Sequence, residues 1–391
     1  MSATWVVYFK EMRESLRDRR VLMNSLLLGP LLGPVLFLVL MRLVIGRELE
    51  KAERPLPVVV IGAERAPELI DAMKQMGLVV KPAIADPELA VREQRIDLAL
   101  RIAADFGAAW RAGRPAQVEI IYDSSRREGG SDVDRLRGML DSYSHRNGAL
   151  RLLARGLAPS IASPLVVANR DTATPQGRGA LLFAMLPYML VLTIFIGGLW
   201  LAIDSTAGER ERQSLEPLLA NPVPRDRILL GKLLATASFS TASLTLGLLA
   251  FLCVGMFMPT EQLGMSLALG PHFFAIALPV LVPLVLLLCI GQILIAAFAR
   301  SVREAQTYLG IAQLVPLIPS IVLSVLPVKA QLWMYAVPLL GQQLAIMRLL
   351  RAEPVPALAL ALSAVVTLLA ATAVFLLTRR VYDSERLAIA T

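Results

Sequence analysis

Side chains that often carry chemistry are scarce in this 391-residue chain, which has only two cysteines and two histidines. Both cysteines, Cys253 and Cys289, stand in uncharged apolar runs, which favours a packing role over a redox one. Two cysteines cannot build a disulfide scaffold, and an apolar chain without a glycine period is neither disordered nor collagen-like. The sequence therefore excludes the disulfide-rich, fibrous and disordered classes.

Charge is also scarce, because Asp, Glu, Lys and Arg together make up 18% of the chain, against about 25% in a typical soluble domain. Hydrophobic residues make up 56%. So much apolar surface needs lipid to cover it. The net charge of +8 is for the same reason interpreted by where the basic residues lie, and not as a nucleic-acid signature.

Six stretches contain no Asp, Glu, Lys, Arg or His, and each is long enough to cross about 30 Å of hydrocarbon as a helix. They are Val21–Met41, Leu181–Ile203, Leu233–Met258, Phe273–Ala299, Thr307–Val328 and Ala357–Leu377. A soluble core helix rarely stays uncharged over about 18 residues, and a membrane bundle tolerates prolines as kinks. The sequence thus predicts a mainly α, polytopic membrane protein with six transmembrane helices.

The orientation follows from the lysines and arginines near the ends of these stretches. Fifteen of them lie before the first stretch, between the second and third, between the fourth and fifth, and after the last, whereas the opposite short connections hold three. Basic residues collect on the cytoplasmic side. Both termini are therefore expected in the cytoplasm, and the longest polar segment, between the first and second spans, is expected outside.

Four parts follow from this pattern. Residues 1–20 are predicted to form an amphipathic helix on the cytoplasmic membrane surface, with a solvated helix as the alternative, and residues 21–45 form the first span. Residues 46–180 form an extracytoplasmic α/β domain between spans 1 and 2. Residues 181–391 hold spans 2 to 6, the cytoplasmic segment 204–232 and a cytoplasmic tail.

The extracytoplasmic domain alternates between two patterns. Short β-branched runs predict strands, and periodic segments between them predict helices. The strands are expected at Pro57–Ile61, Leu78–Lys81, Asp97–Ile102 and Gln117–Tyr122. The helices are expected at Pro67–Met76, Pro87–Arg95, Asp105–Ala112 and Asp132–Arg155.

Catalytic and nucleotide-binding signatures are missing from the sequence. It has no G-x-G-x-x-G after a strand, no H-E-x-x-H and no G-x-S-x-G, and His145 has no second ligand candidate beside it for a metal site. It also has no G-x-x-x-x-G-K-[ST], so active transport needs an energy source in another subunit. We expect no catalytic residue and no metal site in this chain.

The polar groups within the spans are neutral. The absence of Asp, Glu and His there argues against a carrier driven by a proton or sodium gradient, which usually needs a titratable or cation-binding side chain in the membrane. The Ser and Thr residues of the third span are expected to let helices approach closely. Gln292 and Gln313 are candidates to face a transport pathway or the bundle interior, because an amide facing lipid is costly.

The segment Asp204–Lys232 is the most distinctive cytoplasmic part of the sequence. Ser214 is placed to cap a short helix with Pro217 in its first turn, and Leu215, Leu218 and Leu219 then make an apolar knob. Such a helix can enter a groove on a cytoplasmic partner. The alternative is a plain turn between two spans.

The segment resembles the permease subunit of ABC exporters of the type-2 export class, most closely the sodium-efflux permease branch. Residues that match the family pattern A-G-E-R-E-x-G-T-L-E-x-L-L-x-x-P, with G-K further on, are Ala207, Gly208, Glu209, Arg210, Glu211, Leu215, Glu216, Leu218, Leu219, Pro222, Gly231 and Lys232. The chain departs from this pattern at Gln213, where the family has Gly, and at Ser214, where it has Thr.

A second resemblance lies between the fourth and fifth spans, where Glu304-Ala305-Gln306 matches the family's E-A-Q signature. Ser301 and Glu304 also form an S-x-x-E capping box. Glu304 can therefore serve either to cap the helix or to contact the partner. A further apolar segment, Trp333 to Leu350, resembles the short membrane-dipping segment of such permeases.

The resemblance implies a multi-pass protein of the bacterial inner membrane that moves its substrate out of the cytoplasm. It implies two permease copies, or one copy with a close relative, joined to two separate ATPase subunits that bind ATP and Mg. The partner contacts would be made by Gly208, Glu209, Arg210, Glu211, Ser214, Leu215, Glu216, Leu218, Leu219, Glu304 and Gln306. Sodium is the implied substrate, and a lipid or an amphipathic drug is the alternative substrate. The alternative from another functional class is a gradient-driven carrier that needs no ATPase.

Overall fold

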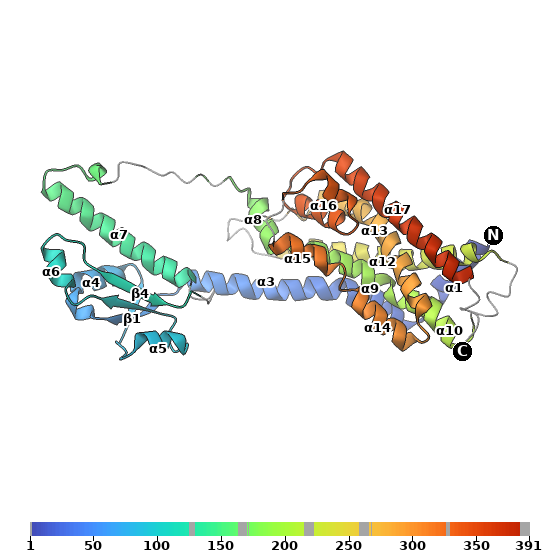
Figure 1. Cartoon of the computed structure of the whole chain (residues 1–391), viewed down its shortest axis with the longest axis horizontal. Coiled ribbons are helices and arrows are strands. Elements are labelled where there is room, and N and C mark those ends of the chain that lie inside the picture. The colour runs from blue at the N-terminus through green and yellow to red at the C-terminus, as the bar shows by residue number, and fades with distance from the viewer. Residues whose placement is uncertain are drawn as a thin grey trace. The chain divides into compact units, whose positions relative to one another are not determined.

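The computed structural model describes residues 2–124, 130–162, 170, 172–214, 223–257, 266, 268–325 and 329–383. The chain divides into two compact units. Unit 1 comprises Met1–Val44 and Asp171–Thr391, and unit 2 comprises Ile45–Arg170. Figure 1 shows the helices of unit 1 and the small sheet of unit 2. The expected domain 46–180 also included α8 (Pro175–Leu182), which belongs to unit 1.

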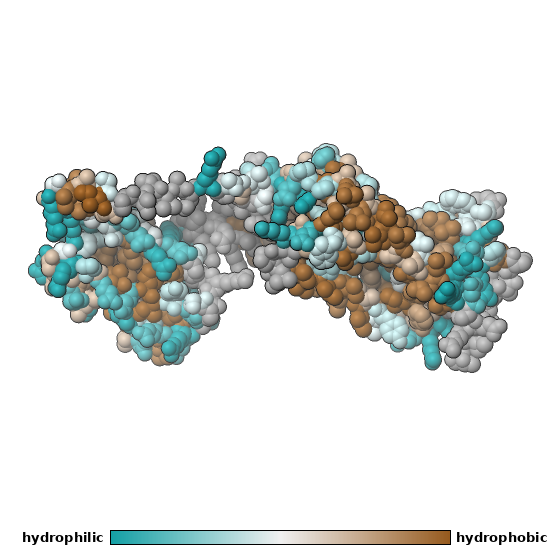
Figure 2. All heavy atoms as spheres, turned by 45° about the horizontal axis from the view of Figure 1, so that its top comes forward, coloured by the Kyte–Doolittle hydropathy of each residue, from teal (hydrophilic) through white to brown (hydrophobic). Residues whose placement is uncertain are grey.

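Unit 1 is a helical bundle, and its described residues contain six segments long and apolar enough to cross a membrane, as the sequence predicts. They are Arg19–Leu43, Leu186–Glu211, Arg225–Phe257, Pro271–Phe298, Val302–Leu323 and Ala357–Asp383. Their outer sides carry the hydrophobic surface that Figure 2 shows in brown. The chain is therefore a mainly helical, multi-pass membrane protein.

Three of these segments are single helices and three are composite. The single helices are α12 (Arg225–Phe257), α13 (Pro271–Phe298) and α17 (Ala357–Asp383). The first segment joins α2 (Arg19–Leu22), a π-helical turn and α3 (Gly29–Glu53). The second continues α9 (Leu186–Ile203) through a π-helical turn into α10 (Glu209–Glu211). The fifth breaks between α14 (Val302–Ala312) and α15 (Leu317–Val325).

The break in the fifth segment has a local cause. Pro316 lies just before α15 and cannot donate the backbone N–H that a continuous helix needs there. The segment Trp333 to Leu350, in contrast to the fifth segment, forms no full span. It folds as a 3₁₀ turn, Leu332–Ala336, followed by α16 (Leu340–Leu350).

Helices α9 and α12 pack at close range because the glycines of α9 face serines of α12. A Cβ added at Gly197 would lie 2.5 Å from the Ser243 Cβ, and one added at Gly198 would lie 2.5 Å from the Ser240 Oγ. Two of the α12 hydroxyl residues thus serve helix packing, as expected for small polar residues in a membrane bundle.

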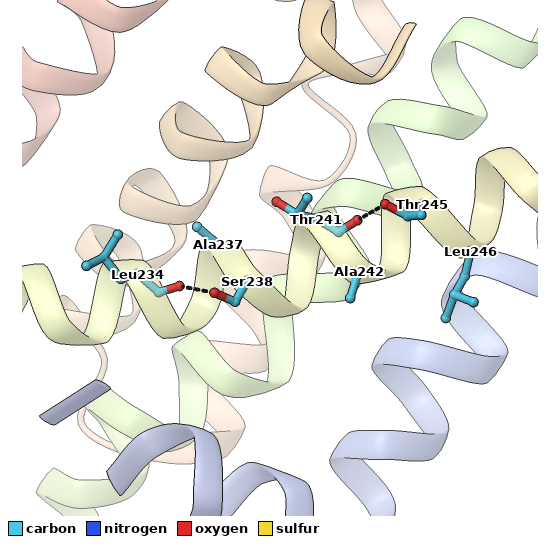
Figure 3. Close-up of a pocket in the computed structure, with 7 residues that line it drawn as sticks. All are labelled: Leu234, Ala237, Ser238, Thr241, Ala242, Thr245 and Leu246. Carbon is cyan, nitrogen blue, oxygen red and sulfur yellow. Dashed lines mark hydrogen bonds between the residues drawn. The ribbon is translucent and has the colours of Figure 1, made fainter. Parts of the chain in front are cut away.

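Other α12 hydroxyls lie along an open groove. The groove has a volume of about 650 Å³ and is lined by Leu234, Ala237, Ser238, Thr241, Ala242, Thr245 and Leu246 (Figure 3). Ser238 Oγ donates to the Leu234 carbonyl and Thr245 Oγ1 to the Thr241 carbonyl. These hydroxyls are satisfied by their own helix, so they impose little cost where they face the groove.

Helix α1 (Ala3–Arg17) docks against α12 along the stripe Val7, Glu11 and Ser15. Those three residues are four apart, so they lie on one side of the helix. The aromatic face expected at the membrane surface points elsewhere, since Trp5 and Phe9 remain about half exposed. Exposed aromatic area beside basic residues is suited to a headgroup layer.

Unit 2 contains a four-stranded sheet with the order β2-β1-β3-β4. The strands are β1 (Leu56–Ile61), β2 (Leu78–Lys81), β3 (Leu98–Ile102) and β4 (Val118–Tyr122). The first three pair in parallel and β4 is antiparallel to β3, with Leu100 opposite Ile120. Each strand begins within one residue of its predicted position and ends at it.

The helices of unit 2 are α4 (Pro67–Gln75), α5 (Pro87–Arg92), α6 (Phe106–Arg111) and α7 (Gly130–Ala154). Residues of α4 and α7, among them Met73 and Leu136, form one core with the sheet residues Val58 and Leu100. Helix α5 packs on β3 and β4. The parallel strands need such helical crossovers, which explains why strand and helix patterns alternate in the sequence.

Candidate functional site

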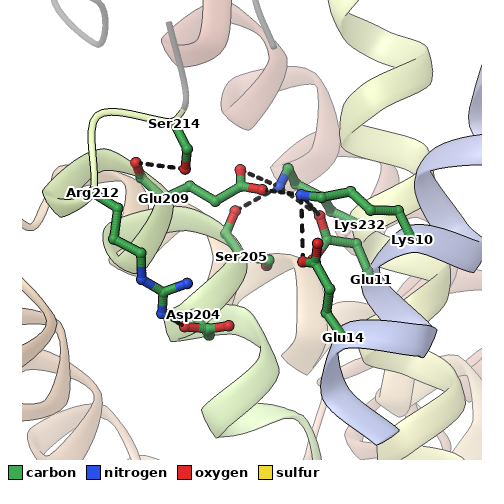
Figure 4. Close-up of polar contacts among 9 residues, drawn as sticks. All are labelled: Lys10, Glu11, Glu14, Asp204, Ser205, Glu209, Arg212, Ser214 and Lys232. Carbon is green, nitrogen blue, oxygen red and sulfur yellow. Dashed lines mark hydrogen bonds and ion pairs between the residues drawn. The ribbon is translucent and has the colours of Figure 1, made fainter. Parts of the chain in front are cut away.

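The structure describes the two ends of the segment 204–232, residues 204–214 and 223–232. Leu215, Glu216, Leu218 and Leu219, the candidate partner contacts on the predicted short helix, lie outside the described residues. The described ends come together at a cluster of charged side chains. This buried ion-pair cluster consists of Lys10, Glu11, Glu209 and Lys232 (Figure 4).

Lys232 is the centre of the cluster and is fully buried. Its Nζ donates to Glu11 Oε1 at 2.9 Å, to Glu209 Oε2 at 2.6 Å and to the Ser205 carbonyl at 2.6 Å. These three acceptors use all three N–H groups of the ammonium. A buried charge is tolerated only when its partners satisfy it in this way.

Lys10 completes the cluster from the side that faces solvent, and its side chain is 38% exposed. Its Nζ pairs with Glu209 Oε1 at 2.5 Å and with Glu14 Oε2 at 3.6 Å. Burial opposes the charge on Lys10, but the carboxylates of Glu11 and Glu209 outweigh it and raise the pKa of Lys10 above the ordinary lysine value. The lysine therefore stays charged throughout the physiological pH range.

Two local features position the central lysine. The π-helical turn Asp204–Gly208 interrupts the regular ladder at the end of α9, and the Ser205 carbonyl in it accepts from Lys232 instead. Gly231 lets α1 approach α12, because a Cβ there would lie 2.8 Å from both the Thr4 carbonyl oxygen and the Val7 Cβ. Gly231 thus allows the close contact between α1 and α12, and the adjacent Lys232 provides the buried cation.

The remaining motif residues after α9 form a helix end. Arg212 pairs with Asp204, eight residues earlier, on the exposed side. Gln213 adopts a positive φ of 56°, and the Ser214 N–H donates to the Glu209 carbonyl at 2.9 Å. This is the left-handed helix end that usually carries glycine. The position where the family pattern has Gly is therefore left-handed in this chain although it carries Gln.

We expect Gln213→Gly to stabilise the protein by roughly 0.5–1 kcal/mol, because glycine adopts a positive φ without the steric cost that glutamine bears. The measurement is the melting temperature of purified protein in detergent. Gln306→Gly is the matched control, because Gln306 lies inside α14 and glycine there should lower stability by about 1 kcal/mol. Equal shifts in both variants would contradict the assignment.

The second motif meets the first at the N-terminus of α14. Glu211 Oε2 accepts the Val302 N–H at 2.8 Å, and Arg210 Nη1 donates to the Ala299 carbonyl. Ser301 Oγ accepts the Glu304 N–H, which confirms Ser301 as the cap, and Glu304 accepts from the Arg300 N–H at 2.7 Å and from the Tyr308 hydroxyl. Gln306 is exposed on α14.

The two candidate pathway amides occupy different settings. Gln292 on α13 is buried, and its Nε2 donates to the Phe195 carbonyl at 2.6 Å while its Oε1 has no hydrogen-bond partner. Gln313 is half-buried at the end of α14. The structure does not bring the two together with each other or with the ion-pair cluster. Gln292 ties α13 to α9 next to Gly198.

Lys10 and Glu11 are the members of the site that sequence reasoning missed. Glu11 belongs to the polar residues of the N-terminal helix by pattern, and only its burial beside Val7 distinguishes it. Lys232 follows a run that ends in Gly and precedes an uncharged span. A single lysine at the start of an uncharged span was the only sequence signal for this cluster, and it does not indicate which carboxylates pair with the lysine.

This arrangement is suited to holding helices together. Its two carboxylates are held by two ammonium groups, and no nucleophile takes part. Among the described residues, no group of three or more His, Cys, Asp and Glu side chains could hold a metal ion. The cluster fastens α1, the end of α9 and the start of α12 to one another.

Comparisons with known proteins cover nearly the whole chain. A family described as ABC-2 family transporter protein matches residues 5–379. The ABC transporter permease protein NatB of Bacillus subtilis (strain 168) is 28% identical over 388 residues, which cover 97% of this chain and 98% of that protein. No solved structure matches. The family match includes nearly all of α1, both motifs, five complete candidate spans and most of the sixth.

Proposed function

Because the chain belongs to the ABC-2 family of transporter proteins, we propose that it is the membrane-spanning permease subunit of an ATP-driven exporter. ATP hydrolysis takes place on separate cytoplasmic ATPase subunits, which bind ATP and Mg. Two permease copies, or one copy and a close relative, join two such subunits. This chain contributes the conduit and the surface that receives the ATPase motion.

The buried ion-pair cluster is the observation that carries the proposal. Glu209 lies six residues before Leu215, at the base of the segment that we assign to the ATPase contact. Through Lys232 it is fixed to α12, and through Lys10 and Lys232 it is fixed to α1. A push on residues 215–222 is therefore transmitted to two spans and to α1 together.

Contacts with the second motif connect the same part of the chain to two further spans. Glu211 holds the first N–H group of α14, and Arg210 holds the carbonyl at the end of α13. Both residues precede the proposed ATPase contact by a few positions. Displacing this part of the chain thus acts on α9, α12, α13 and α14 at their common end.

The orientation is proposed from charge. Most basic residues near the span ends lie on the same side as residues 204–232. Because such residues collect on the cytoplasmic side, we assign residues 204–232 and both termini to the cytoplasm. Unit 2 then lies outside the cytoplasm, attached between the first and second spans. The membrane is the bacterial inner membrane.

Sodium ions are the proposed substrate. Hydroxyl and amide oxygens in the spans are hard, neutral groups that suit an alkali cation. The six uncharged stretches at the centre of the spans hold no Asp or Glu to couple transport to a proton gradient. Vesicles that contain the permease and its ATPase should move ²²Na when ATP is supplied. Movement that persists without ATP would favour a gradient-driven carrier instead.

A lipid or an amphipathic drug is the alternative substrate, and one feature favours it. An apolar groove of about 190 Å³ lies between α12, α13 and α17, lined by Leu230, Leu233, Leu286, Ile290, Leu368, Ala371, Thr372 and Phe375. An acyl chain or an aromatic ring fits such a lining. ATP-dependent loss of a fluorescent lipid from the inner leaflet, without ²²Na movement, would favour this class.

The partner contact is tested by recovery of the ATPase from membranes. We expect the tagged permease to recover a cytoplasmic ATPase, and the double variant Leu218→Asp, Leu219→Asp to lose at least about tenfold of that recovery, because two buried leucines contribute several kcal/mol to a contact. Purified alone, the permease should hydrolyse no ATP.

The matched control is Leu89→Asp, which places a charge on an exposed leucine of α5 in unit 2. It should leave the recovery unchanged. Undiminished recovery by the Leu218→Asp, Leu219→Asp variant contradicts the proposed contact. Robust ATP hydrolysis by the isolated chain contradicts the division of labour.

A further inference from the structure

The C-terminal end of α7 carries an apolar stripe on the surface of unit 2. Leu150 and Leu153 lie in the last turns of the helix, Leu157 follows the turn at Gly156, and Ile161 ends the next 3₁₀ turn. These four side chains are 44% to 61% exposed. Figure 2 shows a brown patch on the surface at the upper left. Contiguous apolar side chains on a surface mark an interaction site.

Basic side chains surround this stripe. From Ser142 to Ala162 the chain holds Arg146, Arg151 and Arg155 and no Asp or Glu, whereas the N-terminal half of α7 holds Asp132, Asp134 and Asp141. The neighbouring end of α6 adds Arg111 and Arg114. Helix α7 thus changes from mixed charge to purely positive charge along its length.

The arginines of the two helices are brought close together. Arg151 stacks on the Trp110 ring, 4.0 Å from its centre, and donates to the Trp110 carbonyl at 2.8 Å. The Arg155 Nη2 lies 3.3 Å from where a Cβ of Gly113 would be, next to Arg114. Within the described residues, no carboxylate pairs with Arg111, Arg114, Arg146 or Arg155. No carboxylate in the described part of unit 2 therefore pairs with these four arginines.

We propose that this α7 surface, made by Leu150, Leu153, Leu157 and Ile161 with the arginines around them, binds the face of a bilayer that contains anionic phospholipid. Apolar side chains enter the boundary between headgroups and acyl chains, while arginines pair with phosphates. A second copy is a poor occupant, because two such surfaces would bring arginine against arginine. An anionic lipid surface matches both the apolar and the basic part.

The test uses the full chain in nanodiscs of neutral phosphatidylcholine, mixed with fluorescent vesicles and separated by flotation. Vesicles with roughly 30% phosphatidylglycerol should float with the discs, pure phosphatidylcholine vesicles should not, and high salt should weaken the capture. The variant Leu150→Asp, Leu153→Asp should lower capture by about tenfold or more, since the two leucines no longer enter the interface.

Two further variants separate lipid binding from damage to the fold. Arg114→Glu with Arg146→Glu should lower capture of anionic vesicles while the melting temperature stays unchanged, and Leu89→Asp on α5 should leave capture intact. Capture of neutral and anionic vesicles alike, no capture by the unaltered chain, or full capture by the Leu150→Asp, Leu153→Asp variant would each overturn the proposal. Discs that pair with one another without vesicles would instead indicate contact between copies, and overturn it as well.

Discussion

Replacing Lys232 by methionine should unfold the end of the bundle where α1, α9 and α12 meet, or abolish assembly of the protein. The substitution removes the cation that three buried oxygens share, and leaves Glu11 and Glu209 as carboxylates without their central partner. Breaking a buried ion pair from one side costs about 3–5 kcal/mol. That is a large share of the stability of a typical domain, about 5–15 kcal/mol. The measurement is the yield and melting temperature of purified protein, followed by size exclusion.

Two comparisons make this result specific. Lys10→Met removes the half-exposed lysine of the same cluster, and we expect a loss of only about 1 kcal/mol because solvent screens that pair. Lys232→Met combined with Glu11→Gln and Glu209→Gln removes the orphaned charges, so it should recover much of the lost stability. If Lys232→Met alone melts like the unaltered protein, the cluster does not hold these helices together.

Gly198→Val should prevent normal packing of α9 on α12. A Cβ at this position would lie 2.5 Å from the Ser240 Oγ, 2.8 Å from the Gln292 Oε1 and 3.0 Å from the Thr236 Cγ2. Because three helices meet there, no single side chain can move away without displacing another. Overpacking of this kind costs about 1–3 kcal/mol or more, and we expect a value at the upper end.

The matched control for this substitution is Gly291→Val on α13. No atom lies within 4 Å of a Cβ placed there, so the change alters only the helix propensity of one residue. We expect a stability within about 1 kcal/mol of the unaltered protein. If Gly198→Val is tolerated as well as Gly291→Val, the close approach of α9 and α12 is incorrect.

The elements of this fold were largely predictable from sequence because their signals are local. Six uncharged runs indicate six spans, and the strands of unit 2 alternate with helices at short spacing. The cap at Ser301 was predictable for the same reason, since its acceptor and donor are three residues apart. Element ends were less certain where a helix continues through a π-helical turn, as at Asp204–Gly208.

The ion-pair cluster was not predictable in the same way. Its four members come from three helices, and α1, which holds Lys10 and Glu11, lies about 200 residues away in the sequence from Glu209 and Lys232. The periodicity of the N-terminal helix places Glu11 among the polar residues, whereas the structure buries it and leaves Trp5 half exposed. The amphipathic pattern predicted a helix on the membrane surface, and it gave no sign of the ion pair that offsets the cost of burying Glu11.

Site-specific photocrosslinking tests the proposed coupling most directly. A photoreactive residue replaces Leu218 in the full chain, with the same residue at Leu153 on unit 2 as the comparison, in cells that contain the ATPase subunit. The proposal predicts a crosslink from position 218 to the ATPase and none from position 153. A crosslink to the ATPase from position 153 would contradict it. So would the absence of any crosslink when the photoreactive residue is placed in turn at each position from 215 to 222.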